Sequence, residues 1–135
     1  ERIALLMKDV LRGFMKNGVA RRKSAFLERD DIGGKTGTTN DSISTWFSGF
    51  HNDLVTTIWV GTDDFTSLGE NEYGSTIALP IWLNYMEFKL KTLKTSEDLI
   101  PEKISFGRVN KSTGEIDIES KDNFYFELFL EENVN

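Results

Sequence analysis

Gly33-Gly34-Lys35-Thr36-Gly37-Thr38-Thr39 is the stretch that decides the fold, because the two glycines end a charged segment and an aromatic, β-prone run follows. We predict a strand over about residues 34–39. Alternate side chains of a strand share a face, so Thr36 and Thr38 are expected on the same side. Gly37, between them, removes the side chain that would keep a bound peptide from running alongside the strand.

Two more strands are predicted, over about residues 45–51 and 54–61. Only Asn52-Asp53 separates them, which favours a tight antiparallel hairpin. Apolar residues occupy both faces of the third strand, so we expect it to be a central strand covered on both sides. Large rings at strand and helix positions usually fill space, and three are expected in the core: Trp46, Trp59 and Trp82.

A helix is predicted ahead of the strands. Apolar residues recur at three- and four-residue steps over about residues 2–16, and Asn17-Gly18 is expected to end this helix in a left-handed conformation. Residues 21–31 are charged and lack periodicity. They are expected to form a connecting loop with room for one short helical turn.

A second helix is predicted over about residues 77–92, and apolar residues cover most of its circumference, so we expect it to be well buried. Ser75 or Thr76 is expected to cap it, and Pro80 fits only in its first turn. Together the segments predict an α+β fold, in which an antiparallel sheet of three strands is flanked by helices.

The composition turns acidic after this helix, and we divide the chain into residues 1–95 and a C-terminal extension over residues 96–135. The apolar cluster at residues 124–130 fits an added strand or a helix, and periodicity does not decide between them. The extension is also expected to contain a hairpin, with its first strand, turn and second strand at residues 104–109, 111–114 and 115–118.

The 135 residues carry a formal net charge of −6, distributed unevenly. Residues 1–40 have nine Lys and Arg against five Asp and Glu, whereas residues 41–135 have seven against seventeen. This balance argues against nucleic acid as a partner, because phosphate neutralisation needs a concentrated basic face. Arg21-Arg22-Lys23 fits a solvated loop, and it also fits a patch that draws an anionic substrate toward Lys35.

The chain has no cysteine, so it has neither a disulfide framework nor a thiolate metal site. His51 is the only histidine, and we expect it in a turn or on the surface, since a single imidazole rarely ligates a metal. No cofactor is expected. No apolar run is long enough for a membrane span and no signal peptide begins the chain, so we expect any membrane anchor or targeting segment upstream of Glu1.

A Lys-Thr-Gly triplet that opens a strand is a signature of serine acyl-transfer enzymes. Lys35 offers a fixed positive charge, and the hydroxyls of Thr36 and Thr38 can converge on one anionic group. The Thr38 backbone N–H is a candidate oxyanion donor. The partner motifs S-x-x-K and S-x-N are absent from residues 1–135. We therefore predict one wall of an acyl-transfer site whose nucleophilic serine is not in the chain.

Two other interpretations of this stretch exist. The glycine-rich run also fits a bulged strand start without any chemistry. Gly34-Lys35-Thr36 looks like the end of a phosphate-binding P-loop, but that loop needs a glycine where this chain has Arg29, and a helix must follow it. A nucleotide-binding site is therefore disfavoured.

Four ordered segments resemble the C-terminal half of the transpeptidase domain of bifunctional, class A penicillin-binding proteins. They are Ile32–Asp41, Thr45–Phe50, Trp59–Asp64 and Leu79–Trp82. The first predicted helix and Val19-Ala20-Arg21-Arg22 are also similar to the family, and the resemblance covers about residues 1–118. The chain departs from the family pattern at Asn17-Gly18-Val19 and at Gly74-Ser75-Thr76, which bears on loop shapes more than on the fold.

The resemblance implies a β-lactamase/transpeptidase-like fold, incomplete in this chain, and an enzyme that cross-links peptidoglycan at the periplasmic face of the bacterial inner membrane. A serine attacks the D-alanyl-D-alanine end of a stem peptide, D-alanine leaves, and an amine of a neighbouring strand accepts the acyl group. In this family pattern, Lys35 assists protonation and charge balance. Thr36 and Thr38 hold the terminal carboxylate of the peptide or of a β-lactam antibiotic, and the Thr38 amide completes the oxyanion hole.

Two alternative functions stand beside this one. A serine β-lactamase shares the Lys-Thr-Gly strand, although the Trp-Phe-x-Gly-Phe and Trp-Val-Gly runs fit the cell-wall enzymes better. A non-catalytic interaction module would keep the fold without the reaction, and the intact Lys35–Thr38 set argues against it. The isolated chain is expected to be inactive. Its unpaired sheet edge or exposed core surface is expected to pair with another copy of the chain, giving a homo-oligomer, or with a segment that is missing from the chain.

Overall fold

The computed structural model describes residues 1–116 and 122–133. The chain divides into two compact units, Val10–Glu97, and Glu1–Asp9 together with Asp98–Asn135. The first unit holds a three-stranded antiparallel sheet and the second a two-stranded one, so the fold is α+β, as predicted. In the described ranges, none of the helices has the length and apolar character needed to cross a membrane.

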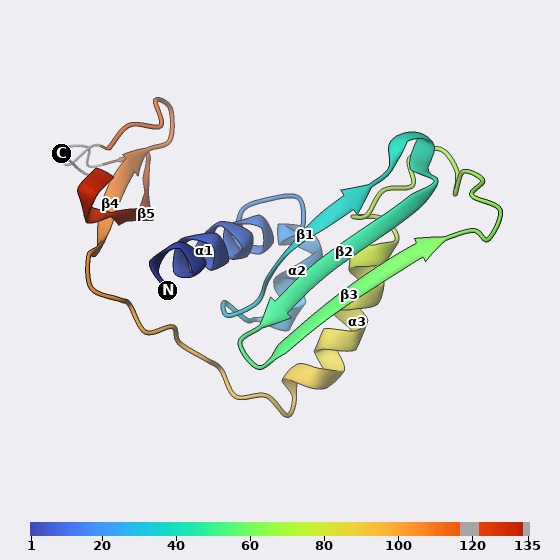
Figure 1. Ribbon diagram of the computed structural model, residues 1–135, viewed down its shortest axis with the longest axis horizontal. Helices are drawn as coiled ribbons and strands as arrows, with labels where there is room; N and C mark the ends of the chain where they lie inside the picture. The colour runs from blue at the N-terminus through green and yellow to red at the C-terminus, as the bar shows by residue number, and fades with distance from the viewer. Residues whose placement is uncertain (117–121, 134–135) are drawn as a thin grey trace. The chain divides into compact units, whose positions relative to one another are not determined.

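The three-stranded sheet has the order β1-β2-β3, with bounds Gly33–Thr38, Ser44–His51 and Leu54–Gly61 (Figure 1). A 3-10 turn at Asn40–Ser42 joins β1 to β2. The strands lie within one residue of their predicted bounds. The expectation that the third strand is central is wrong, because β2 lies between the other two. Nor is β3 covered on both faces, since Val55, on the face opposite α3, is 78 % exposed.

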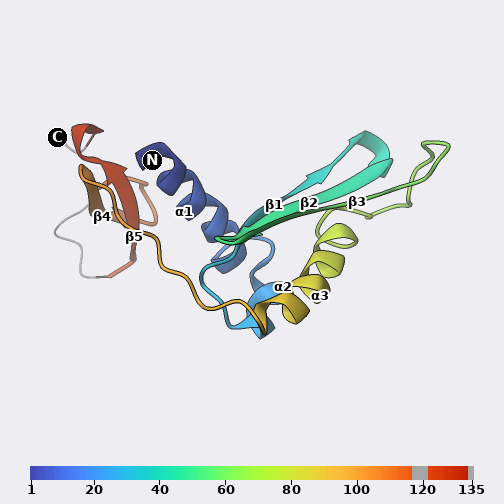
Figure 2. The same cartoon turned by 60° about the horizontal axis from the view of Figure 1, so that its bottom comes forward.

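Helix α3 (Ala78–Leu90) lies along one face of this sheet and builds its core (Figure 2). The Trp82 ring packs on Phe47 of β2, with 4.9 Å between ring centroids. The prediction that most of the helix is buried is correct only for the face toward the sheet, since Ile81 and Phe88 are exposed. Five of its side chains are buried: Ala78, Leu79, Trp82, Leu83 and Met86.

The start of α3 differs from the prediction. Pro80 does lie in the first turn, where its missing N–H removes no helical hydrogen bond. Neither Ser75 nor Thr76 caps the helix, because the N-cap is Ile77 and makes no side-chain hydrogen bond. Thr76 Oγ1 instead accepts a hydrogen bond from the Tyr73 N–H at 2.8 Å, within the preceding turn.

Only one of the three tryptophans is in the core. Trp82 is fully buried, whereas Trp46 and Trp59 are 43 % and 46 % exposed. Trp46 and Trp59 are direct partners across β2 and β3, and their rings meet edge-on at 6.3 Å. The prediction is wrong for these two because they lie on the face of the sheet opposite α3.

Helix α1 spans Arg2–Lys16, as predicted. It does not end in a left-handed conformation, since neither Asn17 nor Gly18 has a positive φ. A side chain is excluded at Gly18 for another reason, because a Cβ there would lie 2.7 Å from the Phe14 carbonyl oxygen. The segment expected to be a loop with one short helical turn contains the four-residue helix α2 (Arg21–Ser24) and a 3-10 turn (Ala25–Leu27).

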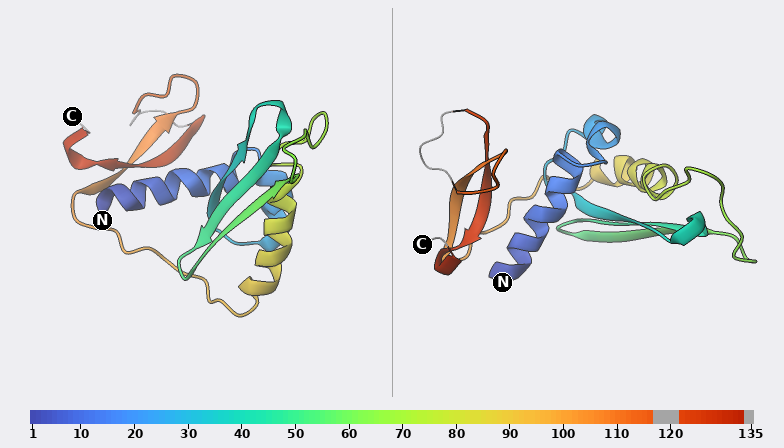
Figure 3. Two further views of the ribbon diagram at one scale, coloured as in Figure 1. Left: turned by 45° about the vertical axis from the view of Figure 1, so that its right-hand side comes forward. Right: turned by 90° about the horizontal axis from the view of Figure 1, so that it is seen from above.

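In the second unit, β4 (Ile104–Asn110) pairs with β5 (Phe124–Leu130) in an antiparallel ladder (Figure 3). A 3-10 turn at Glu131–Asn133 follows. The apolar cluster left open by the sequence is thus a strand. Where the predicted second hairpin strand is described, Ile116 forms an antiparallel bridge with Val109, and the Asn110 N–H donates to the Glu115 carbonyl at 2.9 Å. Residues 117 and 118 lie outside the described ranges.

Candidate functional site

The site predicted at the Lys-Thr-Gly triplet lies on an edge strand, since in the described ranges β1 pairs only with β2. The Thr39 N–H donates to the Ser44 carbonyl directly opposite at 3.1 Å. Hydrogen-bonded and non-hydrogen-bonded pairs alternate along an antiparallel ladder, so Thr36 and Thr38 occupy non-hydrogen-bonded positions. Their backbone N–H and C=O groups therefore point to the open edge of β1, where a ligand can reach them.

The two threonines share a face, as predicted. Thr36 lies opposite Phe47, and Thr38 lies opposite Thr45, and both partners are buried on the α3 side of the sheet. Thr36 is itself half-buried and Thr38 is exposed. Two hydroxyls are thus available at the rim of the sheet, next to the outward-pointing amide of Thr38.

Lys35 does not project from the face of the two threonines. The alternation of the strand places its Cβ on the opposite face, beside Ser48. Its side chain nevertheless reaches the open edge. There Nζ donates to the Thr36 carbonyl oxygen at 3.2 Å and lies 5.0 Å from the centroid of the Phe14 ring.

Gly37 lies in a close cross-strand pair with Trp46. A Cβ at position 37 would be 3.2 Å from the Trp46 Cβ, which is tighter than ordinary contact. The sequence suggested that glycine leaves room for a bound peptide. The close approach of Trp46 is a second reason for a glycine at position 37.

Gly74, in the segment before α3, contacts both threonines. Its N–H donates to Thr38 Oγ1 at 3.0 Å, and a Cβ at this position would lie 3.0 Å from the Thr36 Cβ and 2.7 Å from the Gly37 carbonyl oxygen. Gly74 is buried. From the sequence, Gly74 was noted only as part of a departure from the family pattern. Its contact with Thr38 could not be predicted, because no local signal links residues that are 36 positions apart.

A second polar cluster, which the sequence did not predict, lies at the start of β1 and consists of Arg29, Asp31, His51 and Ser96. Asp31 is 3 % exposed and accepts hydrogen bonds from Arg29 Nη2 at 2.7 Å and from the Ser96 N–H at 2.8 Å. Its Oδ2 lies 3.2 Å from His51 Nε2. His51 is 1 % exposed, so of the two positions expected for it the surface is wrong; it ends β2 beside the hairpin turn, where its Nδ1 accepts a hydrogen bond from the Asp53 N–H at 3.2 Å.

The charged states of Asp31 and Arg29 indicate that this cluster stabilises the fold and does not take part in proton transfer. Burial by itself raises the pKa of Asp31, but the hydrogen bonds from Arg29 and the Ser96 amide, with the positive charge of Arg29, outweigh burial and lower that pKa to about 2. The hydrogen bond to Asp31 in turn raises the pKa of Arg29. Both partners are charged at neutral pH, so neither is suited to transfer protons.

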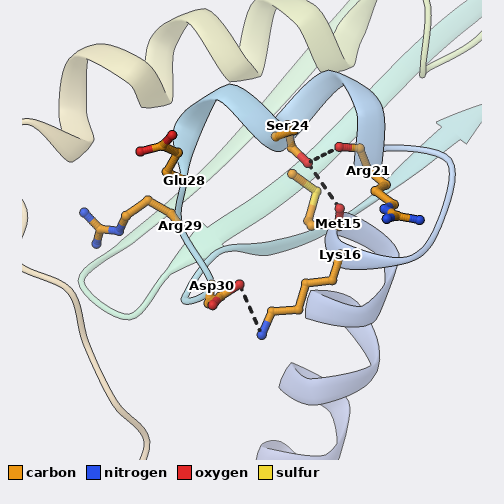
Figure 4. Close-up of a pocket in the computed structure, with 8 residues that line it drawn as sticks. Met15, Lys16, Arg21, Ser24, Glu28, Arg29 and Asp30 are labelled. Carbon is orange, nitrogen blue, oxygen red and sulfur yellow. Dashed lines mark hydrogen bonds and ion pairs between the residues drawn. The ribbon is translucent and has the colours of Figure 1, made fainter. Parts of the chain in front are cut away.

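A pocket of about 480 Å³ lies beside α2, away from the Lys-Thr-Gly strand (Figure 4). Ser24 Oγ donates to the Met15 and Ala20 carbonyls, each at 3.1 Å, and Lys16 pairs with Asp30 at 3.5 Å. The Ser24 hydroxyl is therefore not a free nucleophile. Across residues 1–116 and 122–133, no group of three His, Asp or Glu side chains is arranged to hold a metal ion.

Comparison with protein-family models finds no match. The chain is 44 % identical over 133 residues to penicillin-binding protein 1A of Pseudomonas aeruginosa, an alignment that covers 98 % of this chain and 16 % of that protein. It is 48 % identical over 90 residues to penicillin-binding protein 1A of Neisseria lactamica, covering 67 % of this chain and 11 % of the relative.

A solved structure gives the same result. The crystal structure of penicillin-binding protein 1A from Haemophilus influenzae matches 96 % of this chain at a TM-score of 0.85 and 34 % identity, and the match covers 20 % of that chain. The chain thus spans only a small part of the relatives it matches. The ordered motifs and both kinds of match agree, and the chain is a homologue of penicillin-binding protein 1A and belongs to the class A penicillin-binding proteins.

Proposed function

We propose that this chain supplies the Lys-Thr-Gly wall of a D,D-transpeptidase site that cross-links peptidoglycan. Residues 1–95 would be the C-terminal half of the transpeptidase domain and residues 96–135 an extension. The observation that carries the proposal is the register of β1, which turns the Thr38 amide outward at an open edge, next to two hydroxyls and an ammonium group.

The Thr38 N–H is the proposed oxyanion donor. When a serine attacks the penultimate D-alanyl carbonyl, the carbonyl oxygen gains negative charge, and a fixed N–H dipole stabilises that charge without reorganisation. Removing one such donor typically costs about 2.7–4 kcal/mol of transition-state stabilisation. Because β2 uses none of the outward-pointing groups of Thr36 and Thr38, the strand offers this donor without losing a sheet hydrogen bond.

Thr36, Thr38 and Lys35 are the proposed carboxylate-binding groups. The two hydroxyls lie on one face of β1, and a hydroxyl donates well to an ionised acceptor. Lys35 Nζ lies at the Thr36 carbonyl, so its charge is positioned to balance a carboxylate bound at the rim. The same groups would hold the carboxylate of a β-lactam antibiotic, the second proposed ligand.

The nucleophile is proposed to lie on sequence outside this chain. None of the 135 residues forms an S-x-x-K or S-x-N motif, so the chain alone should not form an acyl-enzyme. The complete protein would be anchored upstream and act at the periplasmic face of the inner membrane. Its partners would be peptidoglycan stem peptides and β-lactams.

The test is acylation of the full-length protein by a fluorescent penicillin, with the 135-residue chain assayed in parallel. We expect slow, stoichiometric labelling of the full-length protein and none of the isolated chain. Thr36→Val and Lys35→Met should each slow acylation at least about tenfold, since each removes a hydrogen bond or charge that acts on an ionised group. Thr57→Val, at an exposed position of β3, is the matched control and should leave the rate unchanged.

Two results would contradict the proposal in different ways. Rapid turnover of a chromogenic cephalosporin would identify a β-lactamase instead. A full-length protein that neither binds nor hydrolyses any β-lactam would identify an interaction module.

A further inference from the structure

We propose that Lys23, Gly74 and Ser75 form a brace that positions the Thr38 hydroxyl as a hydrogen-bond donor to the ligand's carboxylate. This inference rests on the proposed function. It concerns three residues outside the Lys-Thr-Gly triplet. Gly74 contacts the Thr38 hydroxyl, and Lys23 contacts the backbone carbonyl of Ser75.

The first contact of the brace is the hydrogen bond from the Gly74 N–H to Thr38 Oγ1 at 3.0 Å. A threonine hydroxyl has one donor and two acceptor positions. Because Gly74 occupies an acceptor position, it orients the oxygen and leaves the hydroxyl hydrogen for another partner. An anionic acceptor at the open edge of β1 is the partner that this arrangement favours.

The position of Gly74 is fixed by crowding. A Cβ there would lie 2.6 Å from the Trp46 carbonyl oxygen and 2.7 Å from the Gly37 carbonyl oxygen, and both of these are main-chain atoms that cannot rotate away. The Gly74 carbonyl also accepts a hydrogen bond from the Leu79 N–H at 2.8 Å, which ties the turn to the first turn of α3. A glycine is thus needed for the turn to come close enough to reach Thr38.

Lys23 holds the other side of the turn. Its Nζ donates a short hydrogen bond to the Ser75 carbonyl, from a helix 52 positions earlier in the chain. The Ser75 carbonyl lies two peptide units after the Gly74 N–H, so this bond restrains the turn that carries the N–H and does not act on its peptide directly. Lys23 is exposed, and this bond to the Ser75 carbonyl gives it a contact in the fold that the sequence did not indicate.

The consequence is selectivity for a charged ligand over a neutral one. With the hydroxyl held as a donor, a free carboxylate gains a hydrogen bond that its ester accepts much more weakly. Loss of the brace lets the hydroxyl rotate, so it should slow acylation by the carboxylate ligand and leave acylation by the ester unchanged. A general loss of structure would slow both to the same extent.

The experiment measures second-order acylation rates of the full-length protein with a cephalosporin that has a free carboxylate and with its methyl ester. The ratio of the two rates is the readout. Lys23→Met should lower this ratio about three- to tenfold, and Thr38→Val should lower it about tenfold or more. Lys23→Arg, which keeps a donor, should restore most of the ratio, and Arg22→Met, in the same helix, should leave it unchanged.

Gly74→Ala should lower the ratio as Thr38→Val does, and Lys23→Met serves as the independent test in case that variant does not fold. In the Thr38→Val background, Lys23→Met should have no further effect on the ratio, because both changes remove the same donor. The inference is overturned if Lys23→Met leaves the ratio at the wild-type value or lowers both rates equally. A wild-type protein that is not acylated at all would instead contradict the proposed function.

Discussion

Asp31 accepts two parallel hydrogen bonds from Arg29, at 2.8 Å from Nε and 2.7 Å from Nη2. Arg29 also donates to the Leu93 carbonyl at 3.0 Å, and Asp31 accepts from the Ser96 N–H. The pair therefore fastens the segment after α3 to the segment before β1. A buried, bidentate pair of this kind resists separation because each charge would be left without a partner in the core.

The first prediction concerns how the free energy of unfolding changes at low pH. The folded-state pKa of Asp31 is about 2, below the unfolded value near 4, so its contribution to stability is fully present above pH 4 and is lost as the pH falls toward 2. We expect the free energy of unfolding to fall by about 2 kcal/mol across that window. Urea denaturation at a series of pH values measures this, and Asp31→Asn should flatten the dependence. An unchanged slope in Asp31→Asn would show that other carboxylates cause the acid sensitivity.

The second prediction concerns the partner of Asp31. Arg29→Met leaves a carboxylate that is 3 % exposed without its main counterion, and removing one member of a buried pair costs about 3–5 kcal/mol. Denaturation at pH 7 gives the value directly. Arg22→Met, at an exposed position of α2, is the control and should change stability by less than about 0.5 kcal/mol. Equal effects of the two changes would contradict the structural role of the pair.

The third prediction separates the tryptophans. Trp82→Ala empties a fully buried position against Phe47 and should cost about 3–5 kcal/mol. Trp59→Ala should cost clearly less, because that ring is 46 % exposed in this chain. Thermal unfolding of the two variants decides between the observed arrangement and the all-core placement expected from the sequence. Comparable losses would favour the latter.

The fourth prediction uses a pair of glycines. Gly13, within α1, has open space where a Cβ would be, so Gly13→Ala should stabilise the chain by about 0.5–1 kcal/mol through helix propensity. Gly49→Ala should destabilise it, since the new Cβ would lie 2.6 Å from the Trp82 ring. Calorimetry of both variants tests the signs. A stabilising Gly49→Ala would mean that α3 packs differently on β2.

Strand positions could be predicted from sequence because they depend on local signals. Gly33-Gly34 and Asn52-Asp53 punctuate the chain, and the runs between them are rich in β-branched and aromatic residues. The triplet itself was placed correctly on a strand, with Thr36 and Thr38 on one face. Burial was predicted less well, because whether Trp46 and Trp59 are covered depends on which elements pack on that side and not on the residues themselves.

The contacts that support the candidate site could not be predicted for a related reason. The bond between Gly74 and Thr38 and the pair formed by Lys23 with Ser75 join segments 36 and 52 positions apart. His51 has a similar explanation, since a lone histidine gives no sign that Asp31 will lie beside it in the core.

The most direct test of the central claim is the crystal structure of the full-length protein acylated by a β-lactam. We predict that the acyl carbonyl oxygen lies about 3 Å from the Thr38 backbone nitrogen, with the ligand's carboxylate at the hydroxyls of Thr36 and Thr38. An acyl-enzyme whose carbonyl oxygen and carboxylate both lie away from β1, bound by other segments, would contradict it.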